Sequence, residues 1–209
     1  MSRTARWVHG NTVEVEVGIG ERRAVEVLRR GWGTHFLLRE AGRPYWFHFP
    51  IPTLSEERGG NVRLCGVCVC FSTDGTVVRA VHVYDGAKRV AERENLHLVG
   101  DHSLRAYAQN SWPVDPPIPI ERGVGISVGV EVVQEGRFGF PEILFTTAGA
   151  QFRSPRGQHE RGADPAGLGA GSEAGEMTEF EVGEIEGGRP GDWNPGEQSG
   201  GGGSGEGLF

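Results

Sequence analysis

The sequence contains few cysteines of the kind that cross-link secreted domains, and it has no long apolar run of the kind that anchors a chain in a membrane. Its three cysteines, Cys65, Cys68 and Cys70, fall within one apolar stretch of the 209 residues. An odd number of cysteines in one strand is not a disulfide framework, so we expect a reducing, cytoplasmic location. No apolar run approaches membrane-spanning length, and residues 1–7 are polar rather than signal-peptide-like. We therefore expect no membrane partner.

Several catalytic signatures are also missing. The chain has no phosphate-binding loop, no dinucleotide fingerprint and no His-x-His pair of the kind that binds metal in cupins. Asp101, His102 and Ser103 supply the residue types of a hydrolase triad, but consecutive side chains do not face one another. These absences favour a non-enzymatic protein, and we expect no cofactor and no metal.

Charge divides the chain into two parts. Residues 1–152 hold 17 basic and 17 acidic side chains, whereas residues 153–209 hold 4 basic and 11 acidic ones together with 17 of the 35 glycines. A neutral block followed by an acidic, glycine-rich one indicates a folded domain and a flexible tail. Because the domain has no basic surplus to contact phosphates, nucleic acid is not an expected partner.

Short alternating and β-branched segments dominate residues 1–152. The densest, residues 62–86, predicts a β-hairpin with Gly75 in its turn. In residues 124–133 the apolar side chains alternate with Ser127, Gly129 and Glu131. We interpret Gly123, Gly125 and Gly129 as permitting close sheet packing or a bulge. Residues 87–95 have either helical character or a short strand, and the prolines of residues 113–119 suggest a polyproline-like crossing. The pattern predicts an antiparallel β-sandwich, jelly-roll-like, with about eight to ten strands; a closed barrel is the alternative.

The acidic tail contains a few apolar residues, separated by acidic and glycine-rich sequence. An acidic chain alone solvates itself, but apolar side chains at intervals can dock on a sheet edge or in a pocket. We expect these segments to contact a neighbouring copy of the chain or another protein. The candidate docking residues are Phe180, Val182, Ile185, Trp193, Leu208 and Phe209.

The cysteines and histidines offer further candidate chemistry. Cys68 and Cys70 share one face of a strand and Cys65 points to the other, so buried packing explains them better than a metal does. Histidines and acids at strand positions and loops can line a ligand site at one end of the sandwich, together with tryptophans that stack on sugars. The candidate ligand-binding residues are His48, His82, Asp85, Asp101, His102 and Trp112, and the other candidate stacking residues are Trp7, Trp32 and Trp46.

Six segments resemble an uncharacterised bacterial family of all-β domains. They are WVHGN (7–11), WFHFPIP (46–52), VHVYDG (81–86), GDHS (100–103), GISVGV (125–130) and FTTAGA (145–150). The resemblance covers nearly all of residues 7–152 and implies one compact all-β domain. It implies no substrate, cofactor or catalytic residue.

Three functional hypotheses remain open. The first is a non-enzymatic association module whose tail docks on a partner, as the missing catalytic signatures and the tail suggest. The second is a lectin-like domain that binds a small ligand or a carbohydrate. The third is a metal-dependent hydrolase that uses His48, His82 and His102.

Overall fold

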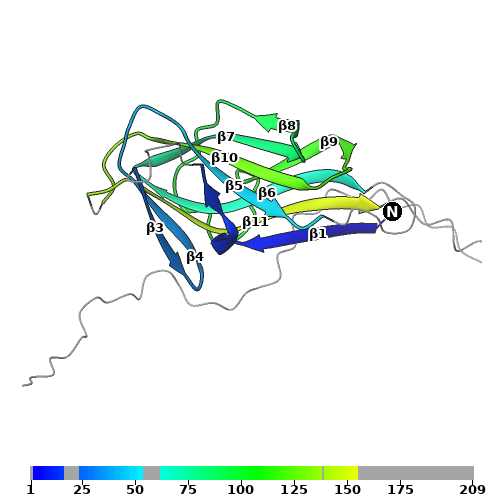
Figure 1. Cartoon of the computed structure of the whole chain (residues 1–209), viewed down its shortest axis with the longest axis horizontal. Helices are drawn as coiled ribbons and strands as arrows, with labels where there is room; N and C mark the ends of the chain where they lie inside the picture. Colours follow the sequence, from blue (N-terminus) through cyan, green and yellow to red (C-terminus); the bar gives the residue numbers. More distant parts are fainter. Residues whose placement is uncertain (1, 17–23, 54–61, 138, 155–209) are drawn as a thin grey trace, which may run out of the picture.

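The protein is an antiparallel β-sandwich. The computed structural model describes residues 2–16, 24–53, 62–137 and 139–154, which form eleven strands in two sheets and, apart from one short 3₁₀ turn, no helix. This confirms the predicted all-β sandwich, and none of the described residues forms a helix able to span a membrane. The two layers are visible in Figure 1, where β5, β10 and β7 lie over β6, β11 and β1.

Sheet A has six strands and sheet B has five. In sheet A, β1 and β4 both pair with β11, each along a different part of it. Sheet A consists of β3 (Val25–Arg30), β4 (Gly33–Leu38), β11 (Glu142–Ser154), β6 (Arg63–Asp74) and β9 (Ser111–Pro119) in that order, with β1 (Ser2–His9) beside β11. Sheet B consists of β2 (Glu14–Val15), β5 (Tyr45–Ile51), β10 (Val124–Val132), β7 (Thr76–Asp85) and β8 (Lys88–Arg93) in that order.

The prediction that residues 62–86 form a β-hairpin is wrong. Its two strands exist, but β6 pairs with β11 and β9 in sheet A, whereas β7 pairs with β10 and β8 in sheet B. Gly75, with φ +70°, turns the chain from one layer to the other. An Asp-Gly step specifies only the positive φ of the turn, so it suits a crossing between sheets as well as a hairpin. Both strands are buried along most of their length, which two central strands in opposite layers require.

Two ambiguous segments are strands. Residues 88–93 form β8, an edge strand of sheet B, rather than a helical turn. The proline-rich residues form β9, which pairs with β6 and, among the described strands, has no neighbour on its other side, so the expected polyproline crossing is instead an edge strand. An edge position tolerates prolines because their missing N–H groups would have had no ladder partner.

The apolar face of each sheet fills the space between them. Side chains that alternate along β10, such as Ile126 and Val128, are fully buried, as their spacing predicts.

All three cysteines are free, and Cys68 and Cys70 are buried, which agrees with their interpretation as small packing residues.

The carboxylate of Asp85 connects the end of β7 to the loop before β10. It accepts hydrogen bonds from the backbone N–H groups of Glu121, Arg122 and Gly123, with N···O distances of 2.9, 2.8 and 3.0 Å. Burial raises the pKa of this carboxyl, but the three amides and the charge of Arg122 outweigh burial and hold it below its usual value.

Asp85→Ala is expected to lower the free energy of unfolding at neutral pH by about 2 kcal/mol, because it leaves three amides without their acceptor. Since the folded-state pKa is depressed, this contribution exists above the unfolded pKa of about 3.9 and disappears as pH falls through the folded value. Urea titrations at several pH values measure the difference. The exposed Asp115→Ala is the control, and an Asp85 effect that persists unchanged in acid contradicts the prediction.

Candidate functional site

One polar row crosses the outer face of sheet B. Directly opposite residues in an antiparallel ladder point to the same side of the sheet, so each pairing in the register places two side chains next to each other. His48 pairs with Ser127 and Ser127 with His82, across the three central strands. Both ends of the row are acidic. The complete row, one residue per strand, is Glu14, His48, Ser127, His82 and Glu92.

Hydrogen bonds hold both histidine rings of the row. His48 Nδ1 lies 2.8 Å from the hydroxyl of Ser127, and its Nε2 lies 3.3 Å from a carboxylate oxygen of Glu16. The Nε2 of His82 lies 2.5 Å from a carboxylate oxygen of Glu94. Because each ring has a partner, the two imidazoles are fixed on either side of Ser127.

Glycines on the central strand hollow the sheet beside this row. A Cβ added at Gly125 would have Cβ of Tyr84 as its nearest neighbour, at 3.9 Å, so the space above Gly125 is open. A Cβ added at Gly129 would lie 3.0 Å from the indole of Trp46, which therefore covers that glycine. The Trp46 ring lies 4.6 Å from the His82 ring, centre to centre.

The result is a trough of about 690 Å³ on the outer face of sheet B. This volume falls within the range of small-molecule sites. Aromatic side chains stand at its sides, imidazoles and a hydroxyl lie along its floor, and carboxylates stand at one rim. Its lining residues are Glu14, Glu16, Trp46, His48, Phe49, Pro50, His82, Tyr84, Gly86, Gly125, Ile126 and Ser127.

The residue that sequence reasoning missed is Ser127. Residues 125–129 match the pattern Gly-x-Ser-x-Gly, which in α/β-hydrolases marks a sharp turn between a strand and a helix. Here the pattern lies in the middle of β10, and the glycines leave room for the trough rather than for a turn. The pattern could have drawn attention to Ser127, but only the register shows that two histidines flank it.

Ser127, His48 and Glu16 contact one another in the order of a hydroxyl, an imidazole and a carboxylate. Nucleophilic catalysis also needs amide donors for an oxyanion. The β10 segment around Ser127 pairs with β5 on one side and β7 on the other, so its backbone amides already serve the ladders. In the described part of the chain, the arrangement therefore offers hydrogen bonds to a ligand and no oxyanion site beside the hydroxyl.

One group in the described residues has donors suited to a metal ion. Ligand atoms of His82, Glu92 and Glu94 all lie within 4.8 Å of one another, and an imidazole with two carboxylates suits a divalent cation such as zinc. Each already has a protein partner, because Glu94 contacts His82 and Glu92 lies 3.1 Å from Arg89. The group adjoins the trough through His82, which lines it.

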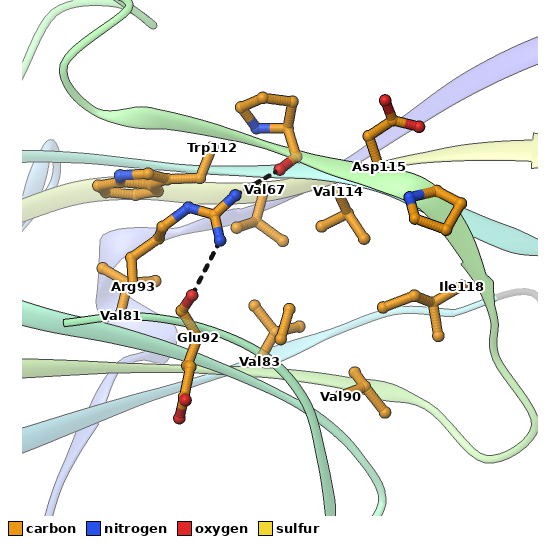
Figure 2. A pocket seen from close by; sticks show the side chains of 13 residues that line it. Val67, Val81, Val83, Val90, Glu92, Arg93, Trp112, Val114, Asp115 and Ile118 are labelled. Atoms are coloured by element: carbon orange, nitrogen blue, oxygen red, sulfur yellow. Dashed lines mark hydrogen bonds between the residues drawn. The ribbon is translucent and has the colours of Figure 1, made fainter.

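A second cavity of about 330 Å³ opens between the edge strands of the two sheets. Figure 2 shows its valines, Trp112 and Ile118 around an apolar space, with Arg93 beside Trp112. Arg93 joins the two edges, because it donates to the carbonyl of Pro113 at 3.0 Å. The walls supply apolar contact but few converging polar groups, so this cavity has less capacity than the trough to orient a polar ligand.

The predicted ligand-binding residues do not gather in one place. His48 and His82 meet in the trough, whereas Asp85 binds backbone amides and Trp112 lines the second cavity. Asp101 accepts from the amide and hydroxyl of Ser103 within one loop. The ring of His102 packs on Phe71 and Tyr107.

The candidate stacking tryptophans are also separate. Trp46 lines the trough, Trp7 packs over Gly149 on sheet A, and Trp32 is exposed at the β3–β4 turn. The tail residues predicted to dock lie outside the described residues, so that hypothesis stays a prediction. They are Phe180, Val182, Ile185, Trp193, Leu208 and Phe209.

Comparison with known proteins identifies the kind of domain. A family model described as a family of unknown function, DUF6623, matches residues 1–137, which agrees with the resemblance to an uncharacterised family. No curated protein matches the chain.

Several solved structures are loosely similar. A low-affinity xylan-binding module from Roseburia intestinalis is 10% identical at a TM-score of 0.40 and covers 72% of this chain and 96% of its own. An exo-β-1,3-galactanase from Phanerochaete chrysosporium is 13% identical at a TM-score of 0.34, and the match covers 72% of this chain and 29% of the galactanase chain. The enzymatically active domain of tailspike protein 4 of bacteriophage CBA120 is 13% identical at a TM-score of 0.34, and the match covers 71% of this chain and 19% of the tailspike chain. This chain thus spans less than a third of the latter two, and TM-scores of this size do not bear on its function.

Proposed function

The chain belongs to the DUF6623 family, whose function is unknown, and we propose that it is a non-enzymatic module that binds a neutral carbohydrate in the trough of sheet B. The observation that carries this proposal is the combination of an open glycine floor with Trp46 and Tyr84 beside the polar row. Sugar rings present apolar faces and a rim of hydroxyls. A site for them needs aromatic surface and fixed hydrogen-bonding groups together.

The polar row supplies groups that can donate and accept. Imidazole and hydroxyl side chains have both capacities, and carboxylates accept from sugar hydroxyls. Because His48 and His82 are held by Glu16 and Glu94, they are ordered before a ligand arrives, which lowers the entropic cost of binding.

Charge at the rim selects the class of carbohydrate. Glu14 and Glu16 line the trough, and 73% and 67% of their side-chain surface is exposed. These carboxylates, of which Glu14 also lies 3.3 Å from the guanidinium of Arg29, disfavour uronic acids and sulfated sugars at short range. The expected ligands are therefore neutral sugars.

Trp46→Ala is expected to weaken carbohydrate binding by roughly tenfold, because it removes the largest aromatic surface of the trough. The full chain is screened against an array of neutral gluco-, xylo-, manno- and galacto-oligosaccharides, and the best probe is then titrated by calorimetry. Gly125→Val is expected to reduce the affinity as well, because its side chain fills open space without removing a donor or acceptor.

Trp32→Ala is the matched control, because this tryptophan is 52% exposed at the β3–β4 turn and lies outside the trough. It should bind like the wild type. Absence of binding to every neutral probe, or equal losses in the Trp46 and Trp32 variants, would overturn the proposal. Hydrolysis of the bound probe that Ser127→Ala abolishes would overturn its non-enzymatic part.

A further inference from the structure

Three arginines from three neighbouring strands lie in one row on the outer face of sheet A. Arg3 of β1 is opposite Arg153 of β11, and Arg153 is opposite Arg63 of β6. Directly opposite residues share a face, and the chain neighbours of Arg63 and Arg153, which are Leu64 and Phe152, are buried in the core. The three guanidinium groups therefore face away from the core, on the opposite side of the molecule from the trough.

This arginine row is not neutralised by the described residues. Neighbouring strands lie roughly 5 Å apart, and like charges directly opposite one another destabilise a sheet. In the described ranges no carboxylate pairs with any of the three, and Arg63 donates to the carbonyl of Pro117 at 3.1 Å. The adjacent row across the same strands is uncharged, since it consists of Ala5, Gln151 and Gly66. An anion placed on the arginine row would relieve this repulsion.

The thiol of Cys65 lies within the field of two of these arginines. Burial raises the pKa of the Cys65 thiol above its ordinary value, while the charges of Arg153 and Arg3 lower it in part. Cys65 lies at the register shift of β6, where it has no directly opposite residue on β11, close to Arg153. Two guanidinium groups from different strands thus act at one point of the sheet surface, as the ladder register implies.

We propose that the arginine row is an anion-binding site and that its occupant is the acidic segment, residues 155–209, of the same chain. This segment holds 11 acidic and 3 basic side chains and begins two residues after Arg153. Residues 176–186 contain five glutamates in eleven positions. A tethered partner has an effective concentration in the millimolar range, so the segment competes well with free anions. Guanidinium groups bind carboxylates through paired hydrogen bonds as well as charge.

The test compares three forms of the full chain by small-angle X-ray scattering at about 0.02 M and about 0.5 M salt, conditions of weak and strong screening. The wild type should be compact at low salt and expand at high salt, with a rise in the radius of gyration of roughly a fifth when the segment is released. The variant R3Q/R63Q/R153Q should show the expanded value at both salt concentrations. Replacing the five glutamates of residues 176–186 with glutamine should do the same.

The control R30Q/R105Q/R137Q removes the same charge from exposed, separate positions and should behave like the wild type. A radius that does not respond to salt, or equal expansion in the two arginine variants, would overturn the proposal. Sedimentation velocity identifies the source of the segment. A doubled mass at low salt that the row variant abolishes would mean that the segment of a second copy occupies the row, and would overturn binding within one chain.

Discussion

Phe145→Ala is expected to lower the free energy of unfolding by about 4 kcal/mol, in the middle of the usual range for loss of a buried aromatic side chain. Phe145 is fully buried, and its ring lies 5.1 and 5.2 Å from the rings of Phe47 and Phe49 and 6.1 Å from that of Phe36. Phe145 and Phe36 belong to sheet A, whereas Phe47 and Phe49 belong to sheet B. The substitution therefore removes contacts that join the two layers and leaves a cavity that rigid strands cannot fill.

Guanidinium denaturation with linear extrapolation measures this loss. The control is Phe140→Ala, because Phe140 is 47% exposed and contacts Arg39 at the surface. It should cost less than about 1 kcal/mol. Equal losses at the two positions would show that Phe145 does not join the layers as described.

Gly10→Ala is expected to cost about 3 kcal/mol or more, although it adds a single methyl group. A Cβ at Gly10 would overlap the backbone of β11, far closer than two non-bonded atoms approach, with the carbonyl carbon of Phe145 at 2.7 Å. The obstacle is backbone in a paired strand, so it cannot rotate away as a side chain could. Either the turn of residues 10–12 or β11 must shift, and that turn leads directly into Glu14 and Glu16 at the trough.

The matched control is Gly31→Ala in the β3–β4 turn, where an added Cβ meets no atom within 4 Å. It should leave stability unchanged or raise it by about 0.5 kcal/mol, since alanine reduces the freedom of the unfolded chain. The same denaturation experiment compares the two variants. A Gly10 variant as stable as the Gly31 variant would contradict the close approach of the turn to β11.

The trough and the arginine row arise from the same feature of the fold. In each case residues distant in sequence become neighbours because antiparallel ladders align them across strands. His48 and Ser127 are 79 residues apart yet form a hydrogen bond, and Arg3 and Arg153 lie at opposite ends of the described chain. Neither grouping is encoded by a local motif.

The sequence by itself determined the elements that depend on local periodicity. Alternation in residues 124–133 places Ile126 and Val128 in the core and Ser127 and Gly129 on the other face, and the structure confirms this with the first two in the core between the sheets and the last two beside the trough. Burial of Cys68 and Cys70 and the all-β class follow from the same reasoning, because side-chain direction along a strand repeats every two residues.

Only the tertiary structure decided which strands pair and in what register. Residues 62–86 are an example. Their Asp-Gly turn is compatible with a hairpin and with a crossing between sheets, and the crossing forms because it buries both strands, one in each layer. Pairing depends on backbone hydrogen bonds that are the same for every sequence and on packing between distant residues. The alignment of Glu14, His48, Ser127, His82 and Glu92 in one row therefore became visible only once the five strands of sheet B lay side by side.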